Sequence, residues 1–287
     1  MKFWAALAVV VLPVCLGAGP EPKVMSGIPV PPRVFSGEIR ILDWNIDKGK
    51  RLEQVASLIR TRKPDLVLIQ EVDLNAPRTG RMNITAELAR KLGMNWIYGP
   101  SFRELGQGTH DEPAYNGQGI LTTLPIRSSR ILMFEHQSGF WKPQPFLPNW
   151  GLLQRRAGGR TALIAEFGGS KTELAVYNLH LESRSGSARF AQLDEVLRDA
   201  DRYGPDVTVV VAGDLNSKFR KGVYEEKLRN KLFHNCLDIR QRTHRLCCTL
   251  DWIVVRGPAS CSESSVLRGA KGSDHFPVET KIVLKQR

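Results

Sequence analysis

Five short polar motifs hold the residue types in this sequence that could do chemistry. Each motif lies at the end of a stretch whose apolar residues predict a buried strand. Asn, Asp, Glu and His at strand ends are typical of groups that a sheet presents for catalysis rather than for its core. Such a cluster suits a divalent cation and the cleavage of a phosphate ester. The motifs span residues 43–47, 70–72, 178–183, 213–216 and 273–277.

The first two motifs supply predicted ligands for Mg²⁺ or Mn²⁺. Glu71 follows the apolar run 66–69, where an unpaired carboxylate would be costly. Asn45 and Asp47 alternate along an extended segment, so we expect both to point the same way. Mg²⁺ takes one or two carboxylates and keeps several waters. We predict Glu71 and Asn45 as metal ligands and Asp47 as a substrate-binding neighbour. The alternatives are a salt-bridged glutamate and a simple turn.

The fourth motif predicts groups that handle an attacking water. Asp214 and Asn216 follow the apolar strand 207–212 with the same spacing as Asn45 and Asp47. Asp214 can hold or polarise the water, and Asn216 can position it. Gly213 lets the backbone turn sharply in front of them. The alternative is an ordinary Asp-Leu-Asn turn.

Two histidines complete the predicted catalytic set. His180 can donate a hydrogen bond to a phosphoryl oxygen or protonate a leaving group, and Asn178 in the same motif is predicted to bind substrate. For His275 we predict Asp251 as the carboxylate that orients the ring, which leaves the other nitrogen free as a base or donor. Asp274 is predicted at the metal. Standing alone, His180 would be interpreted as a hydrogen-bonded, half-buried histidine.

The composition favours an anionic partner. The chain has 287 residues and a formal net charge of +12, which suits nucleic acid or an acidic membrane surface; the plainer interpretation is solubility. The length and the 42% hydrophobic share allow one large α/β domain. No Gly-x-Ser-x-Gly elbow, P-loop or Gly-x-Gly-x-x-Gly fingerprint is present.

The N-terminus predicts export. Lys2 precedes an apolar run, and small residues follow it, so we interpret residues 1–18 as a cleaved signal peptide. The run is too short to be a permanent membrane anchor. Lipid attachment at Cys15 is the alternative. The expected destination is outside the cell or the periplasm.

The remaining four cysteines predict disulfides, as is usual in exported proteins. Three pairings are possible. Adjacent cysteines rarely bond to each other, so we expect Cys247 and Cys248 each to pair with Cys236 or Cys261. A zinc site is the alternative, but the sequence shows no Cys-x-x-Cys or nearby histidine spacing in its favour.

The pattern along the chain predicts one domain. Residues 19–36 are rich in Pro and Gly and are predicted to be a flexible linker, followed by a single domain over 37–287. Strands occur both as hairpins and in alternation with helices, so we expect an α/β sandwich of mixed sheets with helices outside. The predicted helices are 51–62, 85–92 and 187–203. The predicted strands are 39–44, 65–70, 119–123, 161–167, 173–179, 207–212, 250–255 and 278–284.

The segment 137–159 has no clear periodicity and combines aromatic residues with arginines. It predicts either a surface loop or a lid that contacts substrate through stacked rings and Arg–phosphate contacts. Arg155 is the predicted substrate-binding residue of this segment.

Taken together, the motifs resemble the endonuclease/exonuclease/phosphatase superfamily, the metal-dependent phosphohydrolases related to pancreatic deoxyribonuclease, abasic-site endonucleases and tyrosyl-DNA phosphodiesterases. The matching pieces are Trp-Asn-Ile-Asp at 44–47, Gln-Glu-Val at 70–72, His-Leu-Glu-Ser at 180–183, Gly-Asp-Leu-Asn at 213–216 and Ser-Asp-His at 273–275. The resemblance implies a four-layer sandwich and Mg²⁺ or Mn²⁺ dependence. It also implies roles for Asn45 and Glu71 at the metal, His180 at the phosphate, Asp214 and Asn216 at the water, and Asp251 with His275 as an acid–base pair beside Asp274.

We therefore expect an exported, monomeric, metal-dependent phosphodiesterase that acts on DNA or RNA. One alternative is a phosphatase or phospholipase acting on inositol phosphate or sphingomyelin-type lipid headgroups. Another is a non-catalytic protein that uses the same scaffold to bind polyanions.

Overall fold

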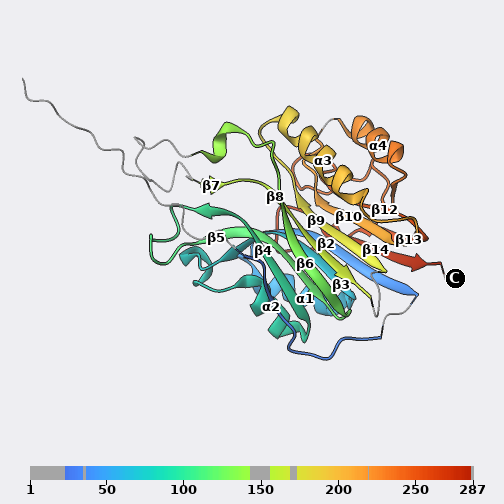
Figure 1. The fold of residues 1–287 in the computed structure, drawn as a ribbon. Coiled ribbons are helices and arrows are strands. Elements are labelled where there is room, and N and C mark those ends of the chain that lie inside the picture. Colours follow the sequence, from blue (N-terminus) through green and yellow to red (C-terminus); the bar gives the residue numbers. More distant parts are fainter. Residues whose placement is uncertain (1–22, 35–36, 143–155, 169–172, 219, 286–287) are drawn as a thin grey trace, which may run out of the picture.

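Two β-sheets packed face to face form the centre of the molecule (Figure 1). A computed structural model describes residues 23–34, 37–142, 156–168, 173–218 and 220–285. The first sheet contains β1 (Met25–Gly27), β2 (Glu38–Lys48), β3 (Leu66–Leu74), β4 (Asn95–Glu104), β5 (Tyr115–Thr122), β7 (Arg156–Gly158), β13 (Ala259–Val266) and β14 (Val278–Leu284). The second contains β6 (Ile126–Met133), β8 (Thr161–Phe167), β9 (Leu174–His180), β10 (Thr208–Asp214), β11 (His234–Asn235) and β12 (Asp251–Arg256).

Both sheets mix parallel and antiparallel neighbours. The first has the order β1-β4-β5-β3-β2-β14-β13, with β7 against β4, and the second has the order β11-β12-β10-β9-β8-β6. Within them β2 is parallel to β3 and β9 is parallel to β10, whereas β14 and β12 run antiparallel to β2 and β10. Parallel strands therefore end where their antiparallel neighbours begin. This arrangement brings all five polar motifs to one edge of the sandwich.

Helices cover the outer faces of both sheets. In Figure 1, α1 (Leu52–Arg62) and α2 (Ile84–Leu92) lie against the first sheet, and α3 (Gly186–Ala200) and α4 (Lys221–Asn230) lie against the second. Short 3-10 turns occur at Pro77–Thr79 and Gly139–Trp141. The predicted four-layer α/β sandwich is confirmed. Among the described residues, no helix has the length and apolar character needed to span a membrane.

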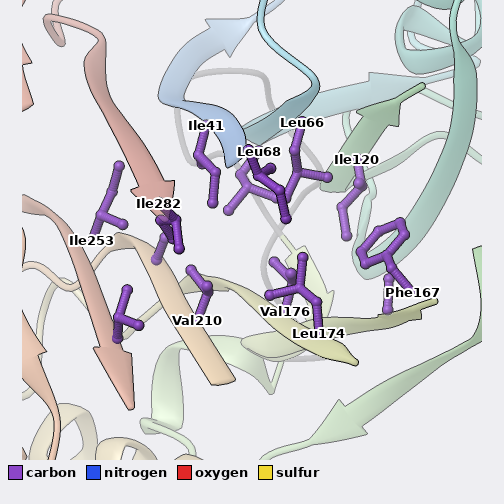
Figure 2. Close-up of a cluster of buried hydrophobic side chains, with 14 of the residues drawn as sticks. Ile41, Leu66, Leu68, Ile120, Phe167, Leu174, Val176, Val210, Ile253 and Ile282 are labelled. Carbon is purple, nitrogen blue, oxygen red and sulfur yellow. The ribbon is translucent and has the colours of Figure 1, made fainter. Parts of the chain in front are cut away.

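The core between the sheets is apolar. Figure 2 shows Ile41 and Leu68 of the first sheet pointing toward Val176 and Val210 of the second. These side chains are at most 1% exposed, and burying each contributes about 1.5–3 kcal/mol. The tight packing fixes how the two sheets sit relative to each other, and with it the distances between catalytic groups carried by different sheets.

The predicted helices and strands all occur, and the structure adds the strands β1, β4, β6, β7, β11 and β13 and the helix α4. One boundary is corrected. Part of the predicted flexible linker belongs to the fold, because β1 pairs with β4 and the Val30 amide donates to Asn95. The signal-peptide prediction falls on residues 1–18, outside the described part of the chain.

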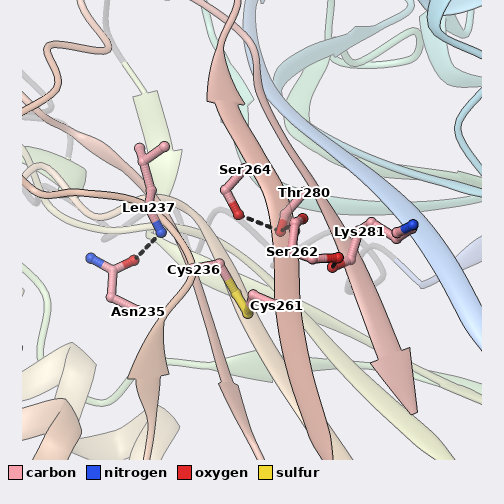
Figure 3. Close-up of a disulfide and its surroundings, with 8 residues drawn as sticks. All are labelled: Asn235, Cys236, Leu237, Cys261, Ser262, Ser264, Thr280 and Lys281. Carbon is pink, nitrogen blue, oxygen red and sulfur yellow. Dashed lines mark hydrogen bonds between the residues drawn. A yellow bond between two sulfur atoms is a disulfide. The ribbon is translucent and has the colours of Figure 1, made fainter.

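One disulfide joins the two sheets at their edge. Cys236 follows β11 of the second sheet and Cys261 lies in β13 of the first, and they are bonded to each other (Figure 3). The prediction that Cys247 and Cys248 each pair with one of these cysteines is wrong, because the two partners bond each other across the sheets. Cys247 and Cys248 have free thiols.

Candidate active site

Each of the five motifs contributes one side chain to a cluster centred on Asp214. The Asn45 amide nitrogen lies 3.4 Å from Oε1 of Glu71 and 3.3 Å from Oδ2 of Asp214. The same Asp214 oxygen is 3.5 Å from Nε2 of His180 and 3.7 Å from Nε2 of His275. Two of these five residues come from the first sheet's strands, two from the second sheet's, and His275 from the turn before β14. The sandwich therefore assembles one site from distant segments.

Glu71 is turned into the site by an irregularity in β3. The pairing of β3 with β5 shifts between Ile69 and Val72, and Glu71 has a left-handed φ of 53°. A bulge of this kind redirects a side chain and is common beside active sites. The Glu71 carboxylate accepts a hydrogen bond from Lys48 at 2.6 Å. Burial alone would raise the pKa of Glu71, but the Lys48 ammonium holds it well below its ordinary range.

The extended segment on which the predicted alternation of Asn45 and Asp47 rests ends before Asp47, although the Asp47 backbone N–H donates to the Asn45 side-chain oxygen at 3.3 Å. Asp47 and Lys48 both have positive φ values, 43° and 70°, so the backbone is no longer extended there. Asp47 instead pairs with Lys48 at 2.8 Å and Lys50 at 3.3 Å. Lys48, which the sequence did not single out, thus links Asp47 to Glu71.

His275 is held by a buried carboxylate. Its Nδ1 lies 2.9 and 2.8 Å from the two oxygens of Asp251, which begins β12 and is fully buried. Burial lowers the pKa of His275, but Asp251 and Asp214 outweigh it and raise the pKa to about 10. The ring is therefore protonated near neutral pH in the metal-free protein, and its Nε2 faces Asp214.

His180 has the opposite electrostatic environment. Burial, reinforced by the Arg160 guanidinium, lowers the pKa of His180 to about 3. The ring is therefore neutral, and suited to donating a hydrogen bond rather than carrying charge. Paired groups whose pKa values are pushed apart are typical of acid–base sites.

Asp214 and Asn216 form a tight turn at the end of β10. The Asn216 amide N–H donates to Oδ1 of Asp214 at 2.9 Å, and its side chain donates to the Leu181 carbonyl. Gly213 before them lies so close to β9 that an added Cβ would sit 2.1 Å from the Leu179 oxygen. Asn216 thereby fixes the position of the Asp214 carboxylate.

Asp274 lies at the rim of the site. It accepts a hydrogen bond from Ser273 at 3.1 Å, and Oδ2 lies 3.6 Å from Nε2 of His244. Burial opposes ionisation, but His275 and Ser273 lower the pKa of Asp274. His244, which the sequence did not single out, packs edge-on against His275 with ring centroids 4.8 Å apart.

Asn178, which was predicted to bind substrate, is fully buried and hydrogen-bonds to the opposite sheet. Its amide donates to the carbonyls of Ile69 and Gly119 in the other sheet, and its oxygen accepts from Gln70. Gln70 also donates to Asp43, whose pKa burial and then Asp251 raise well above the ordinary value. Asn178 therefore ties the two sheets together beneath the site and has no donor hydrogen left for a substrate.

Arg160 is a buried cation beside the site that sequence reasoning missed. It is 6% exposed, and its Nε has no hydrogen-bond partner among the described residues. The guanidinium lies 5.1 Å from the Trp141 ring centroid and 5.8 Å from that of Phe102. It helps to lower the pKa of both Glu71 and His180. An arginine held in this way can receive an anion.

Ser138 and Trp141 are both held by Glu182, a carboxylate of the third motif. This carboxylate accepts hydrogen bonds from Ser138 at 2.8 Å and from Trp141 at 2.7 Å. Arg184 stacks on Phe140 at 3.8 Å. Arg155, predicted to bind substrate, lies outside the described residues.

The donors present fit a hard divalent cation. Glu71 carries an ionised carboxylate, and the Asn45 side-chain amide and the Asp214 carboxylate lie beside it. The Asn45 amide nitrogen faces both carboxylates, so its oxygen would turn toward them when a cation is bound. Oxygen ligands of this kind suit Mg²⁺ and Mn²⁺ rather than thiophilic metals. The Lys48 ammonium at Oε2 of Glu71 already shows that this oxygen attracts a cation.

A known protein family matches most of this sequence, and solved structures share its fold. The family model described as "Endonuclease/Exonuclease/phosphatase family" matches residues 44–275. No curated protein matches the chain. A solved endonuclease/exonuclease/phosphatase structure from Beutenbergia cavernae is similar, with 18% identity over 86% of this chain and 72% of that one and a TM-score of 0.63.

Two further structures have the same fold. ANGEL2, described as a 2',3'-cyclic phosphatase, is 14% identical over 87% of this chain and 96% of its own, with a TM-score of 0.62. A humanized TDP2 from D. rerio is 18% identical over 86% of this chain and 99% of its own, with a TM-score of 0.58. At these identities the likeness establishes the architecture.

Proposed function

The chain belongs to the endonuclease/exonuclease/phosphatase family of phosphoric ester hydrolases, and from that premise we propose that it is an exported, divalent-metal-dependent phosphodiesterase acting on nucleic acid. One observation carries the proposal. Asn45, Glu71, His180, Asp214 and His275 meet at one edge of the sandwich, with Asp214 within 3.7 Å of both imidazoles. A merely structural set of residues would not need two histidines in opposite protonation states around one carboxylate.

The cation would be held by Glu71 and Asn45, with Asp274 at the rim. When bound, it would supply positive charge to stabilise the phosphoryl oxygens in the transition state. Lys48 keeps Glu71 ionised and in place until then. We propose Mg²⁺, with Mn²⁺ as its substitute, because the donors are oxygens.

The protein's own groups have distinct proposed roles. Asp214, fixed by Asn216, accepts the proton of the attacking water. Neutral His180 donates a hydrogen bond to a non-bridging phosphoryl oxygen. Protonated His275, oriented by Asp251, gives its proton to the leaving oxygen as the P–O bond breaks. Water thus adds OH to phosphorus and the leaving group departs as an alcohol.

Nucleic acid is the proposed substrate class for three reasons. The net charge of +12 favours a polyanion. Arg160 is a buried cation beside the reacting groups. Arg160 packs against the buried ring of Trp141. Phe140, which is partly exposed, contacts Trp141 and carries Arg184 on its ring, an arrangement that suits bases and phosphates. The ANGEL2 structure, which holds adenosine-2',3'-vanadate, is consistent with a nucleotide ligand on this fold.

The test is a substrate panel. The purified chain is incubated with plasmid DNA, RNA, sphingomyelin and inositol phosphates, each with Mg²⁺ and then with EDTA. Glu71→Gln serves as the inactive variant and Glu53→Gln, which changes a 78% exposed carboxylate, as the matched control. Nucleic-acid cleavage that EDTA and Glu71→Gln abolish is expected. Turnover of lipid or inositol phosphate alone would overturn the substrate class, and binding of DNA without any turnover would overturn the enzyme.

A further inference from the structure

Lys48 holds the position beside Glu71 that a bound cation would need. Its ammonium nitrogen lies 2.6 Å from Oε2 of Glu71 and 2.8 Å from Oδ1 of Asp47. The Asn45 amide nitrogen faces the other Glu71 oxygen at 3.4 Å. Both oxygens of Glu71 therefore face nitrogen donors in the metal-free protein, and the positive charge that balances this carboxylate belongs to the protein itself.

A divalent cation and the Lys48 ammonium compete for the Glu71 carboxylate. Mg²⁺ bonds to oxygen at about 2.0–2.1 Å, so a cation on Oε2 would lie at most about 4.7 Å from an ammonium that kept its 2.6 Å contact with that oxygen. Like charges at this separation repel, and they do so more strongly where little water surrounds them. The Lys48 side chain is only 15% exposed. The cation therefore binds more readily once the ammonium has withdrawn.

The side chain of Lys48 can move while its backbone stays in place. Gly49, the next residue, has a φ of 79°, and its amide donates to the Ile46 carbonyl at 3.0 Å, so a tight turn fixes the main chain here. The lysine side chain is a flexible four-carbon stem that ends in a point charge. Asp47 can keep its hydrogen bond to the ammonium while the contact with Glu71 breaks.

The displaced ammonium has hydrogen-bond donors to offer a phosphate. A lysine ammonium carries three N–H groups, and within the described part of the chain two of those of Lys48 have acceptors, Asp47 and Glu71. Release from Glu71 leaves a second N–H without an acceptor. The reaction proposed above requires the phosphate to lie beside Glu71 and Asp214, and its anionic oxygens would then be next to the ammonium. Lysine is a common ligand of phosphate groups.

We propose that Lys48 is a substrate-contacting residue that exchanges partners. Its ammonium neutralises Glu71 in the free protein, and it binds a non-bridging oxygen of the phosphate ester once a divalent cation has taken its place. The exchange involves hydrogen bonds and ion pairs alone. This inference rests on the proposed function, because it assumes that cation and phosphate meet at Glu71, and it adds a protein cation that serves first the empty site and then the substrate.

Calorimetry of Lys48→Met tests both halves of the exchange without turnover. Mn²⁺ is titrated into the metal-free protein, and inorganic phosphate, the group that all candidate substrates share, is titrated into protein saturated with Mg²⁺. We expect the variant to bind Mn²⁺ at least about tenfold more tightly than the wild-type protein, because the competing charge is gone. It should bind phosphate at least about tenfold more weakly, because a charged donor is lost.

The result separates this inference from the proposed function. If neither the wild-type protein nor Lys48→Met binds Mn²⁺, the metal assignment itself fails. If both bind Mn²⁺ with the same affinity, or the variant binds it more weakly, the metal assignment stands and the exchange is overturned. A phosphate affinity that Lys48→Met leaves unchanged, or a wild-type protein that binds no phosphate, overturns the contact with substrate.

Two further variants control for charge and for folding. Lys50→Met removes the same charge from a side chain that contacts Asp47 at 3.3 Å and is 46% exposed, and it should bind Mn²⁺ and phosphate as the wild-type protein does. Equal tightening of Mn²⁺ binding in Lys50→Met and Lys48→Met would show a general effect of net charge and overturn the proposal. Lys48→Gln keeps a hydrogen-bond donor for Glu71 without the charge, and it replaces Lys48→Met in the same tests if that variant does not fold.

Discussion

Replacing Asp251 by Asn is the sharpest test of the proposed chemistry. Asp251 is fully buried, and both its oxygens lie within 2.9 Å of Nδ1 of His275. Asn keeps the shape but removes the charge that holds the imidazolium. A hydrogen bond to a charged group contributes about 1.5–3 kcal/mol, and misorientation of the ring adds to the loss. We expect kcat/KM to fall roughly 30- to 1,000-fold, equivalent to about 2–4 kcal/mol.

The same variant makes a prediction about pH. In the metal-free protein, Asp251 and Asp214 raise the pKa of His275 from 6.5 to about 10 against the opposing effect of burial. Because the folded value lies above the unfolded one, this stabilisation is fully present below pH 6.5 and is lost as the pH rises through about 10. Asp251→Asn removes the charge that raises the pKa of His275. The free energy of unfolding of the variant should therefore be lower than that of the wild-type protein near neutral pH. The difference between the two proteins should shrink as the pH rises toward 10.

The assay combines steady-state hydrolysis of bis(p-nitrophenyl) phosphate with denaturant unfolding in EDTA across that pH range. Asp238→Asn is the matched control, since Asp238 pairs with exposed Arg240 away from the site. Asp251→Asn activity within about threefold of wild type, together with an unchanged pH profile of stability, would refute the acid–base assignment.

Three further changes test other parts of the structure. Glu71→Gln should weaken Mn²⁺ binding in calorimetry at least about tenfold and lower turnover at least about a hundredfold. The control variant Glu53→Gln should bind Mn²⁺ as tightly as the wild-type protein. Equal Mn²⁺ affinity in the two variants would contradict the metal assignment. Arg160→Met should lower kcat/KM on DNA about tenfold or more, mainly through KM, because a desolvated cation facing the anion is lost; an unchanged KM argues against the anion role. Replacing Cys236 and Cys261 by Ser should lower the free energy of unfolding by about 3 kcal/mol, from a crosslink spanning 25 residues, and a Tm shift under about 2 °C would contradict this.

The sequence predicted those helices and strands whose buried residues form an apolar pattern within the element itself. β3 and β10 are continuous apolar runs, and α1 repeats Val55, Ala56 and Ile59 at helical spacing. The elements that were not predicted lack such a signal. β6 is a half-exposed edge strand with polar residues at its centre, and only Tyr224 and Leu228 of α4 are buried. Their structure depends on neighbours distant in sequence.

The candidate site likewise contains some residues that the sequence could predict and others that it could not. Acids and imidazoles at strand ends were identifiable because a buried strand followed by such groups is unusual. The positions of Asn178 and Asp47 could not be predicted. Asn178 hydrogen-bonds to the opposite sheet, and the direction of Asp47 depends on the left-handed backbone angles at residues 47 and 48. Lys48, Arg160 and His244 were missed because basic residues are ordinary on a surface, and only the folded chain brings them beside Glu71, His180 and His275.

The place of β14 bears on when activity can arise during folding. β14 pairs with β2 on one side and β13 on the other, and His275 stands just before it. A chain in which β14 has not yet paired has a gap between β2 and β13 and nothing to hold that histidine. We therefore expect partly folded chains to be inert, with hydrolytic competence arriving only once β14 has closed the sheet.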